Sequence, residues 1–338
     1  MRFETLLRRY PVCSFFALAF GISWGGILFV LNATDFNLLD LRPLDTGLIF
    51  VLMLLGPSVA GLALTALLEG RAGLHRLRAR SAQWRAGLRW YLVALMTMPL
   101  LLLATLWPLS IFLDPAFSPR FQWPLFAIGL VAGSFEEVGW TGFAAPRLLH
   151  RQRLFVAGLW LGLLWALWHV LVDFRQNSSA LGTLWLLEFA VFYVGALTAY
   201  RLLMTWVYAN TQSLLLAVLM HASYTGWLFV LYPATSLEQG LVWQTGFTVV
   251  LWVAVAVVML GRKRRGSWLS MKRPPTPDAI GEPNEAARSW RSRSPVMHVV
   301  RNAGESRPCS AHARTKIKSA QQACGFAAPS VSTFARQQ

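Results

Sequence analysis

Residues 131–147 read VAGSFEEVGWTGFAAPR, and this stretch places two adjacent carboxylates, Glu136 and Glu137, inside an otherwise apolar segment. An acidic side chain at the centre of a membrane-spanning helix costs about 2.5 to 3.5 kcal/mol. Two acids in succession therefore require a partner, a proton, a water-filled cavity or a function. The pair marks a candidate functional site inside a membrane protein.

The whole chain has the composition of such a protein. Of its 338 residues, 55% are apolar and 14% are charged, and the mean hydropathy is +0.47. Its apolar runs are each close to the roughly 20 residues that an α-helix needs to cross the hydrocarbon. We therefore predict an all-α, polytopic transmembrane bundle of about eight spans. The eight runs lie near 12–32, 47–68, 90–113, 124–145, 154–172, 181–204, 212–232 and 241–260.

The net charge of +16 is unevenly distributed. Residues 262–338 hold 15 Lys and Arg against 4 Asp and Glu, a net charge of +11, which leaves +5 for the rest of the chain. Frequent Pro, Ser and Arg without an apolar period predict that this tail is disordered. The basic residues thus lie in loops, where they indicate membrane topology, and in the tail. No nucleic-acid partner is therefore expected.

The arginines also predict the orientation, because cytoplasmic loops are enriched in Lys and Arg. With the N-terminus inside, outer loops hold only Arg42, Arg120 and Arg175 of the 16 arginines before residue 262. We predict a protein of a bacterial cell membrane with both termini cytoplasmic. The inner loop at 69–89 has the pattern of a short basic amphipathic helix, which would contact anionic membrane lipids. The 13 inner arginines are Arg2, Arg8, Arg9, Arg71, Arg76, Arg78, Arg80, Arg85, Arg89, Arg147, Arg151, Arg153 and Arg201.

Two histidines lie in apolar runs that follow the acids. His169 is four residues after Trp165, so these two side chains share one helix face, and Thr225 follows His221 at the same spacing. Imidazole groups within a membrane are natural partners for buried carboxylates. The spacing therefore predicts that helices from distant parts of the chain meet at the acids.

The two acids point in different directions on their helix. Glu136 shares a face with Trp140 and Phe143, whereas Glu137 lies about 100° further around. We hypothesise that Glu136 faces a cavity together with the two histidines, and that Glu137 faces a neighbouring helix.

At these residues the sequence resembles the CPBP family of intramembrane proteases, also called the Abi or type II CAAX prenyl endopeptidase family. The family is marked by EExxxR, by an aromatic residue followed four residues later by His, and by HxxxN or HxxxD, each on its own transmembrane helix. Here the acid pair, Trp165 with His169, and His221 follow that order. The resemblance covers about residues 122–230.

Two positions depart from the family pattern. Thr141 stands where Arg is expected, which removes the usual cationic neighbour of the acids, and Thr225 stands where Asn or Asp is expected. Arg147, which follows Pro146 at the inner end of the same run, is an alternative source of that cation.

The resemblance implies that the first glutamate activates a water for attack on a peptide carbonyl. A buried carboxylate can act as a general base, and neutral imidazole can bind a metal or stabilise an oxyanion. We predict Glu136 as the base, His169 and His221 as ligands of the water or of a metal, Glu137 as an orienting group and Thr225 as a weak donor. Zinc is the candidate metal, held by Glu136, His169 and His221, although the sequence contains no HExxH motif.

The predicted function is an intramembrane endopeptidase acting on a membrane-bound or lipidated peptide. A catalytically weakened scaffold or bacteriocin-immunity protein of the same fold is the alternative. A third hypothesis, a proton-coupled carrier that uses Glu136 and His221, fits the ionisable groups but not the motif order. Glu188 matches no motif and is predicted to make a polar contact between helices.

The chain is thus divided into four parts. Residues 1–121 are predicted to form three transmembrane helices with a basic inner loop, and 122–230 to form the protease-like core. Residues 231–261 supply the last helix, and 262–338 are the basic tail.

Overall fold

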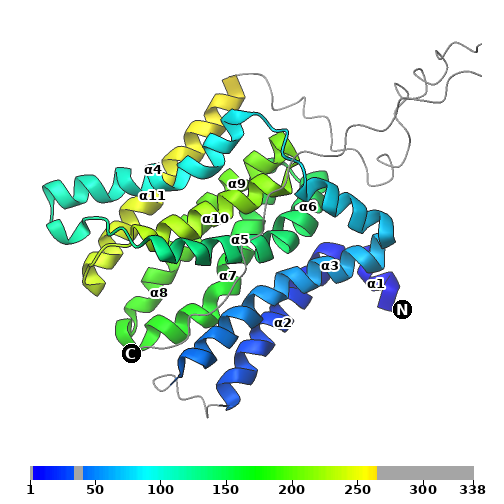
Figure 1. The fold of residues 1–338 in the computed structure, drawn as a ribbon, viewed down its shortest axis with the longest axis horizontal. Helices are drawn as coiled ribbons and strands as arrows, with labels where there is room; N and C mark the ends of the chain where they lie inside the picture. Colours follow the sequence, from blue (N-terminus) through cyan, green and yellow to red (C-terminus); the bar gives the residue numbers. More distant parts are fainter. Residues whose placement is uncertain (1–2, 34–40, 265–338) are drawn as a thin grey trace, which may run out of the picture. The chain divides into compact units, whose positions relative to one another are not determined.

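The computed structural model describes residues 3–33 and 41–264, and every regular element in these two ranges is a helix (Figure 1). The predicted all-α membrane fold is therefore confirmed. Residues 34–40, between the first two predicted spans, and most of the tail at 262–338 lie outside the described residues. Six helical segments are long and apolar enough to cross a membrane: Pro11–Ala33, Pro43–Ser81, Leu88–Phe112, Leu154–Phe174, Leu184–Thr211 and Leu237–Gly261.

The N-terminal part is a helical hairpin. The short helix α1 (Phe3–Arg9) leads into α2 (Pro11–Ala33), which packs along α3 (Pro43–Ser81). A Cβ at Gly56 of α3 would lie 2.4 Å from a backbone oxygen of α2, so the contact depends on a small residue. The chain bends at Gly70, where φ is +61°, and residues 71–81 continue as helix. The predicted helix within 69–89 is thus the end of α3.

The middle of the chain holds the acids. After α4 (Leu88–Phe112) and two single 3₁₀ turns, α5 (Phe126–Gly139) passes into the π-helical turn η3 (Trp140–Ala144) and then into α6 (Ala145–Arg151). The two 3₁₀ turns are η1 (Pro115–Phe117) and η2 (Trp123–Leu125).

The remaining helices follow α6 along the chain. The long helix α7 (Leu154–Leu181) is followed by α8 (Leu184–Phe189), which continues through the π-helical segment η4 (Ala190–Leu197) into α9 (Thr198–Thr211). Two further helices, α10 (Leu214–Val230) and α11 (Leu237–Arg264), complete the described part.

Each of the eight predicted apolar runs is helical in the structure. Two of them fall outside the six long apolar segments: the run with the acids, which is divided by the π turn, and α10, which has 17 residues. The number of membrane crossings and the cytoplasmic position of the termini stay predictions.

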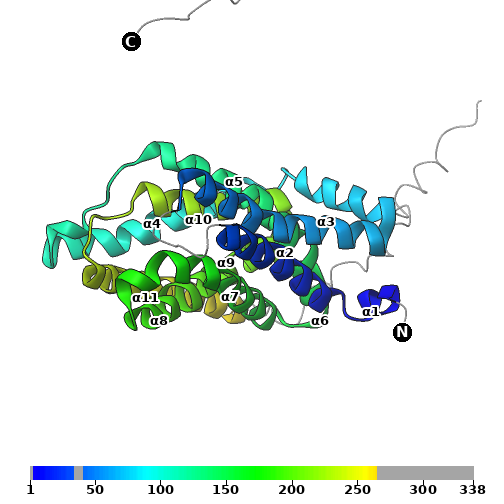
Figure 2. The same ribbon diagram turned by 90° about the horizontal axis from the view of Figure 1, so that it is seen from below.

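Glycines bring α5 and α10 into close contact, and Figures 1 and 2 show the two helices side by side. A Cβ at Gly129 would lie 2.4 Å from the backbone nitrogen of Gly226, and one at Gly133 would lie 2.8 Å from that of Ala222. Glu137 follows Gly133 by one helical turn, so it lies on the same face of α5. This close contact directs Glu137 toward α10.

Arg201 is counted among the 13 inner arginines, and the structure shows that this assignment is wrong. The sequence places it in an inner segment, but α9 continues ten residues further and Arg201 is 1% exposed within the bundle. It is therefore no loop residue and does not report orientation. The physical reason is that Arg201 has a carboxylate partner inside the bundle, so it does not extend to the membrane surface. The other 12 inner arginines still outnumber the three outer ones.

Candidate active site

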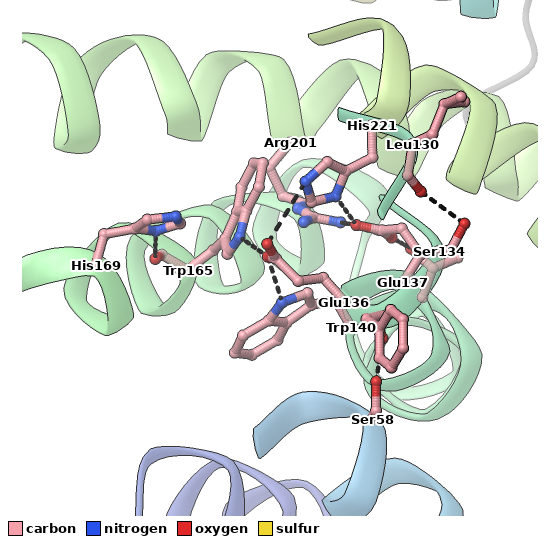
Figure 3. A network of polar contacts seen from close by, with 12 residues as sticks. Ser58, Leu130, Ser134, Glu136, Glu137, Trp140, Trp165, His169, Arg201 and His221 are labelled. Carbon is pink, nitrogen blue, oxygen red and sulfur yellow. Dashed lines mark hydrogen bonds and ion pairs between the residues drawn. The ribbon is translucent and has the colours of Figure 1, made fainter. Parts of the chain in front are cut away.

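Glu136 is held through one of its two carboxylate oxygens. It is 4% exposed, and its Oε2 accepts hydrogen bonds from Nε1 of Trp140 at 3.2 Å and from Nε1 of Trp165, on α7, at 2.8 Å (Figure 3). The other oxygen, Oε1, lies 3.7 Å from Nε2 of His221 on α10. The predicted shared face of Glu136 and Trp140 is confirmed, and Oε1 is the oxygen that neither indole binds.

Glu137 is fully buried, and both of its oxygens are bound. Its Oε1 lies 2.7 Å from Nδ1 of His221, and Nη1 of Arg201 lies 2.9 Å from each oxygen. The hydroxyl of Thr141, one turn further along the chain, donates to Oε2. Because these donors saturate the carboxylate, Glu137 suits an orienting group rather than a base.

The contact with Glu137 decides which nitrogen of His221 carries the proton. A carboxylate can only accept, so Nδ1 of His221 is the donor. In a neutral imidazole the other nitrogen, Nε2, is then an acceptor. Nε2 faces Oε1 of Glu136, which is an acceptor as well. Two facing acceptors require a shared donor between them or a proton on one of them.

The π turn begins directly after the acids and is anchored on both sides. Next to it, Gly139 lies against α3, where an added Cβ would be 2.2 Å from the carbonyl oxygen of Pro57. Within it, the carbonyl of Gly142 accepts a hydrogen bond of 2.7 Å from Nη2 of Arg80. Such turns interrupt regular helices and are frequent at functional sites. Here the turn is fixed against α3, and so are the acids that precede it.

The structure does not bring His169 to the carboxylates. Its Nδ1 lies 2.8 Å from the carbonyl oxygen of Trp165 and donates within its own helix. His169 and His221 both pack against the Trp165 indole, with ring centroids 5.7 and 5.1 Å away. Figure 3 shows this indole between His169 and Glu136. The predicted role of His169 as a direct ligand of the water therefore has no contact to support it.

Thr225 lies one turn beyond His221 on α10 and is half-buried. Its hydroxyl makes no hydrogen bond to any residue that the structure describes. The role of Thr225 as a weak donor stays a prediction that would involve a bound substrate.

Arg201 is the site residue that sequence reasoning missed. Its signal was present, because a lone arginine inside an apolar run needs a buried partner. Arg147, the alternative source of a cation, instead pairs with Glu69 of α3 and donates 2.8 Å to the carbonyl oxygen of Phe143. That alternative is wrong, because the turn of α6 directs Arg147 toward α3 and Arg201 occupies the position beside Glu137.

The predicted metal ligands Glu136, His169 and His221 do not converge. Within residues 3–33 and 41–264, no three His, Cys, Asp or Glu side chains form a group that could hold a metal ion. A catalytic zinc site needs three such ligands around one point. The arrangement fails this requirement because His169 is turned toward the carbonyl of Trp165.

Glu188 makes the polar contact between helices that the sequence predicts. It is 7% exposed, and its Oε1 accepts a hydrogen bond of 3.1 Å from Nε2 of Gln244 on α11. No contact joins it to the acid pair in the described part of the chain.

Comparison with known proteins covers the segment that holds this site. Residues 118–227 match the family model described as "Type II CAAX prenyl endopeptidase Rce1-like". A protein named CAAX prenyl protease 2, from Methanococcus maripaludis, is 32% identical over 111 residues, which cover 31% of this chain and 40% of that relative. This chain thus spans about two fifths of the relative's length. The matched segment contains both acids, both histidines and Arg201. This segment of the chain is thus similar in sequence to the CPBP/CAAX protease family.

Proposed function

We propose that the protein is an intramembrane endopeptidase that hydrolyses a peptide bond of a membrane-bound or lipidated peptide. The observation that carries the proposal is the pair of facing acceptors, Oε1 of Glu136 and Nε2 of His221, 3.7 Å apart. The family match and the name of the relative, a CAAX prenyl protease, support the reaction class.

A single water satisfies both acceptors. At 3.7 Å separation, Glu136 and His221 can each lie within hydrogen-bond distance of one oxygen atom. Such a water would donate one hydrogen to Oε1 and the other to Nε2. Its lone pairs would then be free to attack, and a carboxylate base would be in contact with the proton that must leave.

The proposed reaction balances with the residues at hand. The water oxygen bonds to the peptide carbonyl carbon while Oε1 of Glu136 takes one proton, and the carbonyl oxygen becomes an oxyanion. The protonated Glu136 then gives that proton to the peptide nitrogen. The oxyanion re-forms the carbonyl, the carbon–nitrogen bond breaks, and a carboxylic acid and an amine are released. Trp140 and Trp165 hold Oε2, so the direction of Oε1 is maintained throughout.

The role of Glu137 in this scheme is to orient His221. A buried carboxylate that accepts from Nδ1 fixes the tautomer and the ring direction of an imidazole, as in serine-protease triads. Glu137 meets that description with its 2.7 Å contact to His221. The scheme therefore assigns one acid to the reaction and the other to its support.

The surroundings of the acids favour a substrate that approaches through the membrane. Helix α5 also exposes Leu130, Val131 and Phe135, and these apolar side chains suit contact with lipid chains or with a lipid anchor. Membrane lipids and a membrane peptide are the partners that we propose, in a cell membrane with both termini cytoplasmic.

The decisive experiment compares two buried glutamates in protein reconstituted into liposomes with a library of lipidated and unlipidated membrane peptides. Glu136→Gln keeps the size of the side chain but removes the base, so kcat should fall by about 10² to 10⁴. Glu188→Gln is the matched control and should cleave like the wild type. Full activity of Glu136→Gln would refute the proposal, and absence of cleavage by the wild type would favour the scaffold or immunity alternative. Elemental analysis of the same preparations tests the predicted zinc.

A further inference from the structure

Arg201 lies at the centre of the site. It is 1% exposed, its guanidinium carbon is 3.9 Å from the ring centroid of Trp165, and its Nη1 contacts both oxygens of Glu137 at 2.9 Å. In the described part of the chain Glu137 makes two ion pairs, one with Arg201 and one with His221. A guanidinium keeps its charge in any protein environment, whereas an imidazole does not. Arg201 is therefore the permanent positive charge beside Glu137.

The close contact between α7 and α9 places Arg201. A Cβ at Gly162 of α7 would lie 2.7 Å from the Cα atom of Thr198 at the start of α9, so the two backbones nearly touch there. Trp165 follows Gly162 by three residues, and Arg201 follows Thr198 by three. Gly158 of α7 likewise meets Leu202 of α9, so the two helices run antiparallel, and Trp165 and Arg201 lie on opposite sides of the Gly162–Thr198 contact along the helix axes. The long Arg201 side chain spans this separation and stacks on the Trp165 ring.

Thr141 reaches the same carboxylate from a different helix. Its hydroxyl donates to Oε2 of Glu137, the oxygen that also accepts from Nη1 of Arg201. Positions 141 of η3 and 201 of α9 therefore both border one carboxylate. A cation at either position could neutralise it.

We infer that Arg201 is the positioning residue that keeps Glu137 ionised and thereby fixes the tautomer of His221. The inference rests on the proposed function for its effect on catalysis, but the tautomer is a property of the folded protein alone. It also accounts for Thr141, because the cation for Glu137 comes from α9 instead of from position 141 in η3.

Loss of the cation would reverse the hydrogen bond between Glu137 and His221. An unpaired carboxylate is costly to bury, so Glu137 would take up a proton. Its hydroxyl would then donate to Nδ1 of His221, and the imidazole proton would reside on Nε2. Nε2 would face Glu136 as a donor and could no longer accept from the attacking water. The site would remain folded around the wrong tautomer.

The test uses three variants of the full chain. Arg201→Gln removes the cation, and Thr141→Arg/Arg201→Gln returns it from position 141 in η3. Arg147→Gln is the matched control, since it removes another arginine paired with a glutamate, Glu69, away from the acids. The first readout is the ¹⁵N NMR spectrum of His221 in detergent, assigned by its loss in His221→Gln. The second is kcat and KM of peptide cleavage.

We expect Arg201→Gln to move the His221 proton from Nδ1 to Nε2 and to lower kcat about 10- to 100-fold, the range for loss of a partner that orients a functional group, with KM unchanged. The double variant should return the wild-type tautomer and recover about tenfold in kcat. Arg147→Gln should alter neither readout. An unchanged His221 spectrum in folded Arg201→Gln, or no recovery in a folded double variant, would overturn the inference.

Two further outcomes are distinguishable. If the wild type cleaves no peptide, the proposed function fails, and the NMR readout still decides the role of Arg201. If Arg201→Gln does not fold, Glu137→Gln/Arg201→Gln removes both charges together. This doubly substituted protein should fold, because the loss of stability in Arg201→Gln comes from leaving one buried charge without its partner. Failure of this doubly substituted protein to fold would contradict charge compensation as the role of Arg201.

Discussion

Two of the buried carboxylate sites among these helices are each followed within a few residues by a π-helical turn. The acid pair precedes η3, and Glu188 precedes η4. Their partners differ. Glu136 and Glu137 receive donors from α7, α9 and α10, including a guanidinium and an imidazole. Glu188 receives one amide hydrogen bond, from Gln244.

The partners of Glu188 suit a neutral acid. Its Oε2 and the Oε1 of Gln244 both lie buried without a hydrogen-bond partner in the described part of the chain. A protonated carboxyl group could satisfy both, because its hydroxyl can donate to the amide oxygen. The acid pair has an opposite charge and an imidazole instead. Burial beside a π turn is therefore common to both sites, and the charged partners distinguish the acid pair from Glu188.

The largest effect should come from breaking the charged pair. Glu137→Gln leaves Arg201 as an uncompensated buried charge, which should destabilise the protein by about 3 to 5 kcal/mol. Glu188→Gln removes no charge partner and should cost less than about 1 kcal/mol. Denaturation curves in detergent micelles measure both. Equal losses in the two variants would show that the two sites do not differ in charge state.

An intermediate effect should come from one indole hydrogen bond. Trp165→Phe removes the 2.8 Å donor to Oε2 of Glu136, and a hydrogen bond to a charged group contributes about 1.5 to 3 kcal/mol. If the bond serves the reacting carboxylate, kcat should fall about ten- to hundredfold. Trp168→Phe is the control, because Nε1 of Trp168 has no hydrogen-bond partner among the described residues. A similar loss in both variants would assign the effect to packing.

The smallest effect should come from Thr225, which lies near the acids but contacts none of the described polar groups. Thr225→Val should change stability by about 0.5 kcal/mol or less and kcat by less than about threefold. Kinetics in the liposome assay measure it. A larger loss would show that the hydroxyl contacts the bound peptide, as the family pattern implies for this position.

Much of this molecule follows from the sequence alone. Apolar runs interrupted by charged loops are sufficient for helices, because the backbone in lipid must satisfy its own hydrogen bonds. Local spacing also places Trp140 beside Glu136 and Thr141 beside Glu137, since side chains four residues apart share a helix face. These relations lie within one helix and are independent of how helices pack.

The partners from other helices required the tertiary structure. In the sequence Arg201 and His169 are both ionisable residues inside apolar runs, and nothing there distinguishes their partners. In the structure Arg201 contacts Glu137, whereas Trp165 separates His169 from Glu136. Which face of each helix meets α5 depends on close contacts such as Gly162 with Thr198, and on π turns that rotate the following residues. Both effects arise from packing between segments distant along the chain. The sequence therefore determined the helices and the acids, whereas the fold decided which cation and which histidine bind Glu137.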